Sequence, residues 1–418
     1  MLSSEQFAAA FDEIHPPFSP QEAQVEANRC LFCFDAPCTV ACPTHIDVPR
    51  FIKKIASDNL RGSAMTILDA NVLGLSCSRV CPVDVLCEGA CVMHRYNKQP
   101  IEIGRLQRRA MDYFYETGAR MPLPVTEPTA RSVACIGAGP ASLSCAAELR
   151  RHGVSVTIFE ARDVLGGLNT YGVAEYKFRP ADSQKEVEFI RSLGVEFQTG
   201  QALGERLSLD RLERDFDAIF VGVGLGPTER LNIPGEDLEG VIDAVRFIAD
   251  YKLSRRAQVG QRVVVIGGGN TAIDAAIAAR LLGAEEVTMA YRRGESEMSA
   301  FAFEYEHARL AGVGFLWQAA PLRINGTRGV ESMDVTGAII PCDMVIIAIG
   351  QSKLANLLGT DRNIQFSNGR ISTDPETGKT ANSKYFAGGD CANGGREVVD
   401  AVAEGKRAGR AIAKALHG

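Results

Sequence analysis

The chain has 418 residues, of which 46% are hydrophobic and 23% are charged, and its formal net charge is −6. This composition is typical of a globular protein of two or three domains and excludes collagens, coiled-coil rods and disordered chains. The acidic balance argues against a nucleic-acid partner, no apolar run reaches the ~20 residues of a spanning helix, and the first residues lack a secretory-signal pattern. We therefore expect a cytoplasmic protein without membrane contact.

The residues up to about 120 read as helical. Ser19-Pro20-Gln21-Glu22 is a capping-box sequence with proline at the first helical position, which predicts a helix that runs toward Cys30. Further helices fit Val48–Ala56 and Ile103–Glu116. The proline-rich stretch Met121–Pro128 is then a candidate linker between domains.

Past this linker, short β-branched runs alternate with helical segments. The predicted strands are Ser132–Ile136, Val154–Phe159, Ala218–Val223, Arg262–Ile266, Glu286–Ala290 and Met344–Ile349. Alternating strands and helices predict an α/β fold with parallel sheets. The same strand–glycine–helix pattern occurs twice, so we expect two Rossmann-like dinucleotide-binding domains.

The first glycine turn is Gly137-Ala138-Gly139-Pro140-Ala141-Ser142. Its glycines allow a tight turn and close backbone approach, and the next helix would point its N-terminal amides at a pyrophosphate. Ser142 replaces the usual third glycine, where a small side chain suffices for packing. Glu160 ends the next predicted strand, where a carboxylate can bond a ribose hydroxyl. These features together predict dinucleotide binding.

The second glycine turn is Gly267-Gly268-Gly269-Asn270-Thr271-Ala272. Aligning the two patterns places Tyr291 opposite Glu160, and Arg292 and Arg293 follow it. Loss of the acid and gain of arginines is the pattern expected for a 2′-phosphate, hence for NADP(H). The alternative is that the two arginines belong to a solvated loop.

Cysteines gather at one end of the chain, because eight of the twelve lie between Cys30 and Cys91. The spacing is Cys30-x2-Cys33-x4-Cys38-x3-Cys42-Pro and Cys77-x3-Cys81-Pro-x4-Cys87-x3-Cys91. Disulfides suit small secreted domains, whereas such spacings in a large chain without an export signal indicate metal ligands. Eight thiolates could hold two [4Fe-4S] clusters. Structural zinc is the alternative.

The chain resembles the two-dinucleotide flavoprotein reductases in Leu165–Leu168, Asp217–Gly224 and Thr380–Asp390. The resemblance implies an FAD domain that is split around a domain for NAD(P)H. The expected limits are a helical domain with two clusters at 1–120, FAD segments at 121–226 and 348–418, and the NAD(P)H domain at 227–347. No Cys-x2-Cys or Cys-x4-Cys pair follows the linker, so we do not expect a redox disulfide beside the flavin.

The turns and this resemblance together define the candidate cofactor residues. For FAD they are Gly137, Gly139, Pro140, Ala141, Ser142, Glu160, Gly166, Gly167, Leu168, Lys177, Gly389, Asp390 and Val398. For NAD(P)H they are Gly267, Gly269, Asn270, Thr271, Ala272, Arg292, Arg293 and Gly350. Lys177 stands where related chains usually have an arginine that contacts FAD. We expect no catalytic side chain, because the cofactors carry the chemistry.

A narrower resemblance, to the electron-input part of dihydropyrimidine dehydrogenases, rests on Cys30–Cys38, Leu73–Pro82 and Pro100–Gln107. It implies one cluster on Cys30, Cys33, Cys38 and Cys91, and another on Cys42, Cys81, Cys87 and Gln107. Cys77 is then a spare cysteine. The alternative is that Cys77 is the ligand and that Gln107 only caps or lines its helix.

This resemblance implies an NAD(P)H-dependent oxidoreductase subunit that passes a hydride to FAD and then single electrons through two clusters. It leaves the choice between NADH and NADPH open, because Ser299 stands where NADPH-using members have a further arginine. Uracil or thymine would be reduced on a partner subunit with an FMN barrel and a pyrimidine site, in a hetero-oligomer. The small subunit of glutamate synthase is the alternative; its second cysteine group is more tightly spaced and it typically has glutamate in place of Gln107. A third possibility, from a different class, is a non-catalytic, zinc-stapled scaffold flavoprotein.

Overall fold

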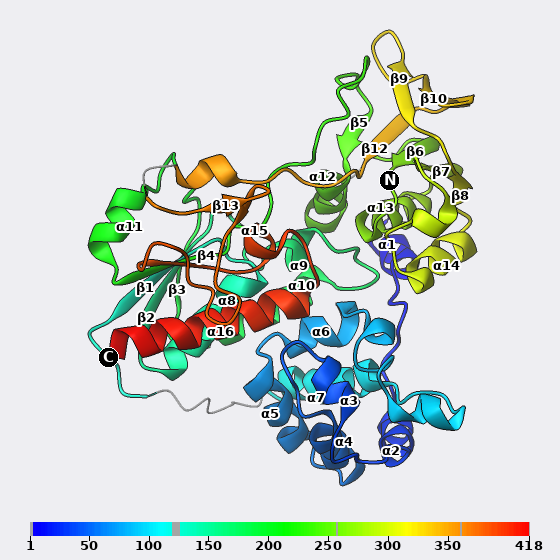
Figure 1. The fold of residues 1–418 in the computed structure, drawn as a ribbon. Coiled ribbons are helices and arrows are strands. Elements are labelled where there is room, and N and C mark those ends of the chain that lie inside the picture. The colour runs from blue at the N-terminus through cyan, green and yellow to red at the C-terminus, as the bar shows by residue number, and fades with distance from the viewer. Residues whose placement is uncertain (1–2, 119–125, 256–257, 360–361, 418) are drawn as a thin grey trace. The chain divides into compact units, whose positions relative to one another are not determined.

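The computed structural model describes residues 3–118, 126–255, 258–359 and 362–417 (Figure 1). Residues 121–125 of the predicted linker, and the domain limit at residue 120, lie outside the described residues. The chain divides into two compact units. Unit 1 comprises Met1–Ile14, Tyr171–Pro180 and Gly226–Ser352, and unit 2 comprises His15–Thr170, Ala181–Leu225 and Lys353–Gly418.

The first part of unit 2 is helical, as the sequence predicted. Its helices are α2 (Pro20–Asn28), α3 (Pro37–Ala41), α4 (Val48–Ala56), α5 (Leu60–Ala70), α6 (Gly74–Val80), η1 (Val83–Val85), η2 (Val92–Tyr96) and α7 (Ile103–Glu116). The predicted capping box is formed, since the Glu22 amide donates to Ser19 Oγ at 3.2 Å and the Ser19 amide to Glu22 Oε2 at 2.8 Å. Helices α4 and α7 pack through their apolar faces, with Phe51 and Leu106 fully buried.

A five-stranded parallel sheet forms the rest of the core of unit 2. In spatial order its strands are β15 (Tyr385–Ala387), β4 (Ala218–Val221), β1 (Ser132–Ile136), β2 (Ser155–Phe159) and β3 (Glu196–Gln198). Alternate residues of β1 enter two different cores, Val133 and Cys135 on one face and Ala134 and Ile136 on the other. Strand β15 comes from the C-terminal segment and pairs with β4. The sheet therefore contains strands from before and after residues Gly226–Ser352 of unit 1 in the chain.

Helices cover both faces of this sheet, as expected for a parallel sheet with crossover connections. The remaining elements of unit 2 are α8 (Pro140–Arg151), α9 (Leu168–Tyr171), α10 (Pro180–Ser192), α11 (Leu209–Asp215), η5 (Ala355–Leu358), β13 (Phe366–Ser367), β14 (Arg370–Ile371), α15 (Asp390–Asn393) and α16 (Val398–His417). Helix α16 runs alongside α8 (Figure 1). The two backbones approach closely at Gly405, where a Cβ would lie 2.0 Å from the Ala141 carbonyl oxygen.

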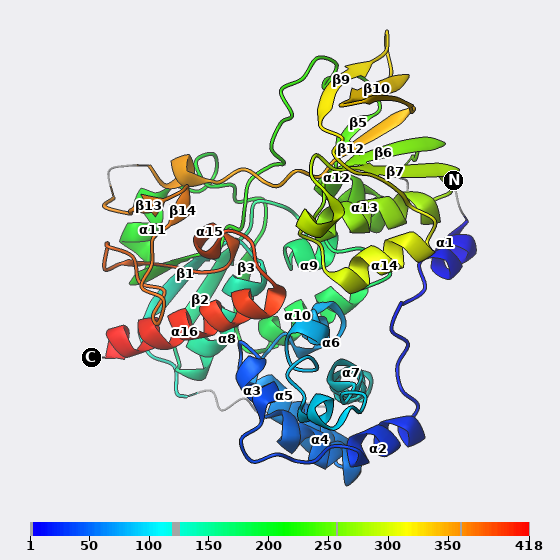
Figure 2. The ribbon, with the colours of Figure 1, turned by 45° about the vertical axis from the view of Figure 1, so that its right-hand side comes forward.

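Unit 1 contains a second parallel sheet, with strand order β5-β12-β6-β7-β8. Figure 2 labels the first four of these strands. These strands are β5 (Val241–Asp243), β6 (Arg262–Ile266), β7 (Glu286–Ala290), β8 (Gly314–Leu316) and β12 (Met344–Ile347). Its helices are α1 (Ser4–Ala10), α12 (Ala244–Ala249), η3 (Asp250–Ser254), α13 (Asn270–Leu281), η4 (Glu295–Glu297) and α14 (Ala302–Leu310). An antiparallel sheet that the sequence did not predict adds β9 (Pro321–Asn325), β10 (Ser332–Val335) and β11 (Ala338–Pro341).

Two segments of unit 1 depart from the domain limits expected from the sequence. Helix α1 does not group with the other N-terminal helices, because Phe7 and Phe11 stack on each other at 4.4 Å and Phe11 lies 5.1 Å from the ring of Tyr251. Residues 171–180, expected in the FAD domain, also belong to unit 1. Among the helices of the described residues, none is both long enough and apolar enough to cross a bilayer.

Candidate functional site

The first glycine turn follows β1 and opens helix α8. Gly137 has φ +89°, and a Cβ there would lie 2.5 Å from the Gly222 carbonyl oxygen, so the turn requires glycine. Gly139 caps α8, and a Cβ built on it meets nothing within 4 Å. Open space therefore lies beside backbone amides at a helix N-terminus, which suits a pyrophosphate.

The side chain of Glu160 is hydrogen-bonded to this turn. Its Oε2 accepts the Ala138 amide at 2.8 Å, and its Oε1 accepts the Arg162 amide at 2.9 Å. A carboxylate has about four lone-pair sites, so a ribose hydroxyl could still donate to it. The side chain of Ser142 is buried and packs closely against Gly222, where a Cβ would lie 2.2 Å from Ser142 Oγ. Ser142 thus fills the packing position of a third glycine.

The structure brings two other predicted FAD segments to the same turn. The Gly166 amide donates to the Ala138 carbonyl at 3.1 Å, and a Cβ on Gly167 would lie 2.8 Å from Gly139 Cα. From the C-terminal segment, a Cβ on Gly389 would lie 3.0 Å from the Cβ of Ala141. The loop that ends in Leu168, and the stretch from Gly389 through Asp390 to Val398 at the start of α16, therefore border the N-terminal end of α8. Burial raises the pKa of the Asp390 carboxyl.

The second glycine turn has a similar backbone. Gly267 has φ +146° and a Cβ there would lie 2.3 Å from the Ala348 carbonyl oxygen, whereas the nearest atom to a Cβ on Gly269 is Ser299 Oγ at 3.6 Å. The Gly268 carbonyl accepts the amides of Ser299 and Ala300, at 3.1 and 3.0 Å. The loop before α14 is thus hydrogen-bonded to the turn through the Gly268 carbonyl.

Other predicted nucleotide residues surround this turn. Asn270 Oδ1 accepts the Phe301 amide at 3.0 Å, so this side chain joins the starts of α13 and α14. Thr271 is exposed at the first turn of α13 and Ala272 is buried, while Gly350 follows β12 with φ +109° and open space at its Cβ position. Arg292 and Arg293 are exposed after β7, and neither guanidinium has an ion pair among the described residues. They could meet a phosphate.

Lys177 lies in a buried ion cluster of unit 1. Its Nζ is 2.6 Å from Asp274 Oδ1 and 2.5 Å from Glu304 Oε1. Tyr176 Oη donates to the same Asp274 oxygen at 3.0 Å. Opposing burial, the two carboxylates raise the pKa of Lys177. The structure therefore shows Lys177 bound to α13 and α14, and its contact with FAD stays a prediction.

Four of the clustered cysteines surround one cavity in the helical part of unit 2. Cys30, Cys33 and Cys38 come from the first group and Cys91 from the end of the second. The rest of the lining is mainly apolar and includes Leu31, Pro37, Val48, Ile52, Met93 and Ile103. Burial raises the pKa of the Cys38 thiol to about 12 and also raises that of Cys30. Iron binding to such thiols would displace their protons.

The other cysteines of the region lie close to one another. A hydrogen bond to Cys77 and burial raise the pKa of Cys81 well above its usual value, and Cys42 and Cys87 contribute to the same shift. The Asn71 amide donates to Cys77 Sγ at 3.2 Å. No three His, Cys, Asp or Glu side chains within the described ranges converge as ligands of a single metal ion.

Gln107 is 7% exposed on α7, and its Nε2 donates to the Gly74 carbonyl at 2.8 Å. This bond turns the amide so that Oε1 is the atom left to act as a ligand. A free amide oxygen fits the carbonyl-type ligand that the resemblance implies. The same bond also joins Gln107 on α7 to Gly74 on α6.

Sequence reasoning missed several buried polar residues near these sites. They are Asp274 and Glu304 beside Lys177, and Ser76, Asn169 and Glu186 between α6, α9 and α10. Glu186 offered one signal, because it is a charged residue on the apolar face of α10 that also carries Val187 and Ile190. Its partners could not be read from the sequence.

Two family profiles match the chain. The profile of pyridine nucleotide-disulphide oxidoreductases matches residues 131–405, which include both glycine turns. The profile described as dihydropyrimidine dehydrogenase domain II, 4Fe-4S cluster, matches residues 7–119, which include all eight clustered cysteines.

Several relatives match nearly the whole chain. The PreT subunit of an NAD-dependent dihydropyrimidine dehydrogenase from Escherichia coli K12 is 34% identical, with 97% of each chain covered over 414 aligned positions. The small chain of NADPH-dependent glutamate synthase from the same organism is also 34% identical, with 96% of this chain and 93% of that one covered over 441 positions. Among solved structures, T. acidophilum thioredoxin reductase has a TM-score of 0.57 at 21% identity, covering 69% of this chain and 100% of its own, which is a likeness of fold.

Proposed function

Because the chain belongs to the pyridine nucleotide-disulphide oxidoreductase family, we propose that it is the electron-input subunit of a dihydropyrimidine dehydrogenase. The coarser function is an NAD(P)H-dependent flavin oxidoreductase that transfers electrons and has a 4Fe-4S domain. Its cofactors are FAD, NAD(P)H and iron–sulfur. The proposal adds the number of clusters, their ligands, the partner subunit and the final substrate.

The cofactor chemistry needs little from side chains. When bound, FAD supplies the conversion of a two-electron hydride into single electrons, which iron–sulfur clusters take one at a time. The α8 amides and the Gly137–Gly139 turn would bind the FAD pyrophosphate, with Glu160 for a ribose. The Gly267–Gly269 turn would do the same for NAD(P)H, with Arg292 and Arg293 for a 2′-phosphate.

The observation that carries the proposal is the cavity in the helical region. Cys91 joins Cys30, Cys33 and Cys38 there, whereas a simple count by sequence order would have placed Cys42 in the first set. This grouping agrees with the first ligand set of the dihydropyrimidine dehydrogenase resemblance and leaves Cys42, Cys77, Cys81 and Cys87 for the second set. In that second set the resemblance implies Gln107 in place of Cys77. The bond from Gln107 Nε2 to Gly74, which leaves Oε1 available, supports the glutamine as the last ligand.

Glutamate synthase is the second candidate, because its small chain is as similar as PreT in percentage identity. The alignment lengths favour the first candidate. Nearly the same share of this chain is matched over 414 positions with PreT and over 441 positions with the glutamate synthase chain, so the latter alignment contains more gaps.

Co-purification tests the two candidates directly. The tagged chain, isolated anaerobically from its own cells, should bring with it an FMN-containing subunit, and the complex should reduce uracil or thymine with NAD(P)H. The isolated chain should reduce dyes but not uracil. A complex that instead makes glutamate from glutamine and 2-oxoglutarate would overturn the proposal in favour of the second candidate.

A pair of variants tests the ligand set. Gln107→Ala should change the electron paramagnetic resonance signal of one cluster or lose that cluster, and Cys77→Ala should keep both. Iron and acid-labile sulfide near eight of each per chain are expected for the wild type. If Cys77→Ala loses a cluster while Gln107→Ala keeps both, then Cys77 is the ligand. Zinc without sulfide would contradict any cluster.

A further inference from the structure

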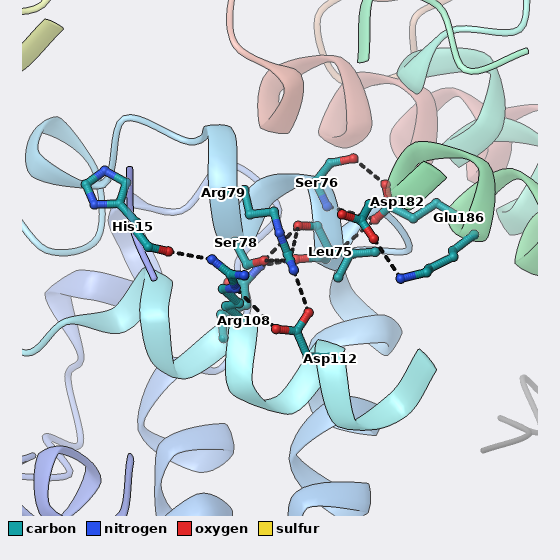
Figure 3. Close-up of polar contacts among 12 residues, drawn as sticks. His15, Leu75, Ser76, Ser78, Arg79, Arg108, Asp112, Asp182 and Glu186 are labelled. Carbon is teal, nitrogen blue, oxygen red and sulfur yellow. Dashed lines mark hydrogen bonds and ion pairs between the residues drawn. The ribbon is translucent and has the colours of Figure 1, made fainter. Parts of the chain in front are cut away.

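A buried carboxylate bridges the helical part of unit 2 and its dinucleotide-binding part. Glu186, on α10, is 1% exposed. Its Oε1 accepts the amides of Leu75 and Ser76, at 2.9 and 3.0 Å, and its Oε2 accepts the Ser76 hydroxyl (Figure 3). These amides belong to the first turn of α6, where a helix carries partial positive charge. The carboxylate therefore fixes the start of α6.

The same contact reaches the loop predicted to bind the flavin. Asn169 follows Gly166-Gly167-Leu168, is 2% exposed, and donates from Nδ2 to Ser76 Oγ at 2.9 Å. Ser76 Oγ is thus bonded to Asn169 on one side and to Glu186 on the other.

Helix α6 also contacts the proposed second cluster site. The Gly74 carbonyl accepts from Gln107, and the helix is followed by Cys81. Gly74, Leu75 and Ser76 are consecutive, so one turn of backbone is bound on one side to a proposed cluster ligand and on the other to Glu186. A change of charge at Glu186 would therefore act on that cluster site through this turn of α6.

The groups that face Glu186 come from four elements. Arg79 on α6 attracts it but is paired with Asp112 of α7 at 2.6 Å, and Asp112 also pairs with Arg108 at 3.2 Å (Figure 3). Tyr115 of α7 is half-buried with a buried hydroxyl, and it is neutral because burial and Glu186 raise its pKa. On α10 itself, Asp182 is paired with Lys185 at 2.7 Å, and α9 contributes only the neutral amide of Asn169.

These surroundings leave the charge of Glu186 finely balanced. Burial raises the pKa of Glu186 to about 7, against the bonds from Ser76 and Leu75 and the attraction of Arg79, which lower it. A nearby negative charge that appears on reduction of a cluster would favour the protonated form further.

We propose that Glu186 is a positioning residue that takes up a proton when the cluster site of Cys42, Cys81, Cys87 and Gln107 gains an electron. The inference rests on the proposed function. Oxidation of NAD(P)H to NAD(P)+ yields two electrons and one proton. The two clusters would each take one electron, and the Glu186 carboxylate would take the proton and become a neutral carboxyl. The proton returns to solvent when the electron leaves for the partner.

The test is the reduction potential of this cluster as a function of pH, followed by electron paramagnetic resonance in the purified chain with its cofactors. In the wild type the potential should fall as pH rises above about 7, with a limiting slope of tenfold in the reduction equilibrium per pH unit, which is about 59 mV. In Glu186→Gln, which keeps an acceptor oxygen but cannot ionise, the slope should vanish and the potential should stay at or above the wild-type value at low pH.

Glu188→Gln is the matched control, since Glu188 lies on the same helix but is 63% exposed and pairs with Arg191. It should behave as the wild type. Ser76→Ala provides a second test, which does not require changing the carboxylate. Loss of the hydroxyl that stabilises the ionised form should move the onset of the slope to higher pH.

The proposal is overturned if the wild-type potential does not depend on pH, if Glu186→Gln keeps the wild-type slope, or if Ser76→Ala leaves the onset unchanged. Iron and sulfide analysis of the same samples separates this result from a failure of the proposed function. If both clusters are intact and the pH dependence of the reduction potential is the same in Glu186→Gln as in the wild type, only the proton uptake is contradicted. A missing cluster would contradict the proposed function itself.

Discussion

Strands β1 and β6 each lead into a glycine turn whose last glycine caps a helix of 12 residues, α8 or α13. The next strand ends differently in the two units. After β2, Glu160 accepts the amide of Ala138 within the turn. After β7, the ring of Tyr291 lies against Gly268, where a Cβ would be 2.6 Å from it, and its hydroxyl donates to the Glu297 carbonyl at 2.9 Å.

The comparison separates two tasks. The turn and the helix N-terminus would bind a pyrophosphate through backbone amides, so this task needs no particular side chain and the geometry for it is alike in both units. The residue after the second strand is the one expected to meet a ribose, and here a carboxylate in one unit is replaced by a neutral ring and two exposed arginines in the other. We therefore expect the backbone to provide the dinucleotide site and a few side chains to select the dinucleotide.

The largest effect is expected from a methyl group in each turn. Gly139→Ala and Gly269→Ala are accepted by the fold, because both residues have negative φ and a Cβ at either has no contact shorter than 3.6 Å. Each methyl would occupy the space of a phosphate, so we expect about 100-fold weaker binding of FAD in the first variant and of NAD(P)H in the second, about 3 kcal/mol. Absorbance of bound flavin and the KM for NAD(P)H measure the two effects.

Unfolding of the two variants provides the control. Alanine at a compatible backbone position should change the stability of the apoprotein by about 1 kcal/mol or less. The separation of tasks would be contradicted if Gly269→Ala lost FAD as readily as Gly139→Ala, or if neither affected its nucleotide.

An intermediate effect is expected at the arginines. Replacing Arg292 and Arg293 by alanine should lower kcat/KM with NADPH at least tenfold, since hydrogen bonds to charged groups contribute about 1.5–3 kcal/mol. With NADH it should change less than twofold. Steady-state dye reduction with both coenzymes measures the difference.

Arg309→Ala is the control for this pair, because Arg309 of the same unit lies on the surface of α14 and pairs with Glu306 at 2.8 Å. Equal losses with NADPH and NADH in the Arg292 and Arg293 variant would show that the two arginines do not recognise a 2′-phosphate.

The smallest effect is expected from Glu160→Gln. The amide keeps one acceptor oxygen for Ala138 or Arg162 but presents an NH2 group to the other backbone donor. We expect FAD to bind about tenfold more weakly, the loss of roughly one charged hydrogen bond. Equilibrium dialysis of FAD measures this, and unchanged affinity would remove Glu160 from the flavin site.

Much of the fold could be read from local patterns. The helices Val48–Ala56 and Ile103–Glu116 have the predicted limits, and the strands before both turns are where the β-branched runs predicted them. Strands β9–β11 were missed because β9 and β11 show little alternation and β10, which does alternate, has only four residues.

The sequence by itself determined the kinds of elements, the two glycine turns and the set of cysteines, because helix caps, tight turns and ligand spacing depend on neighbours a few residues apart. Only the tertiary structure decided that Cys91 shares a cavity with Cys30, that Lys177 pairs with Asp274 and Glu304, and that Glu186 binds the start of α6. Those contacts join residues 61 to 127 positions apart. Buried charges must find partners wherever the fold brings them, and spacing along the chain does not contain that information.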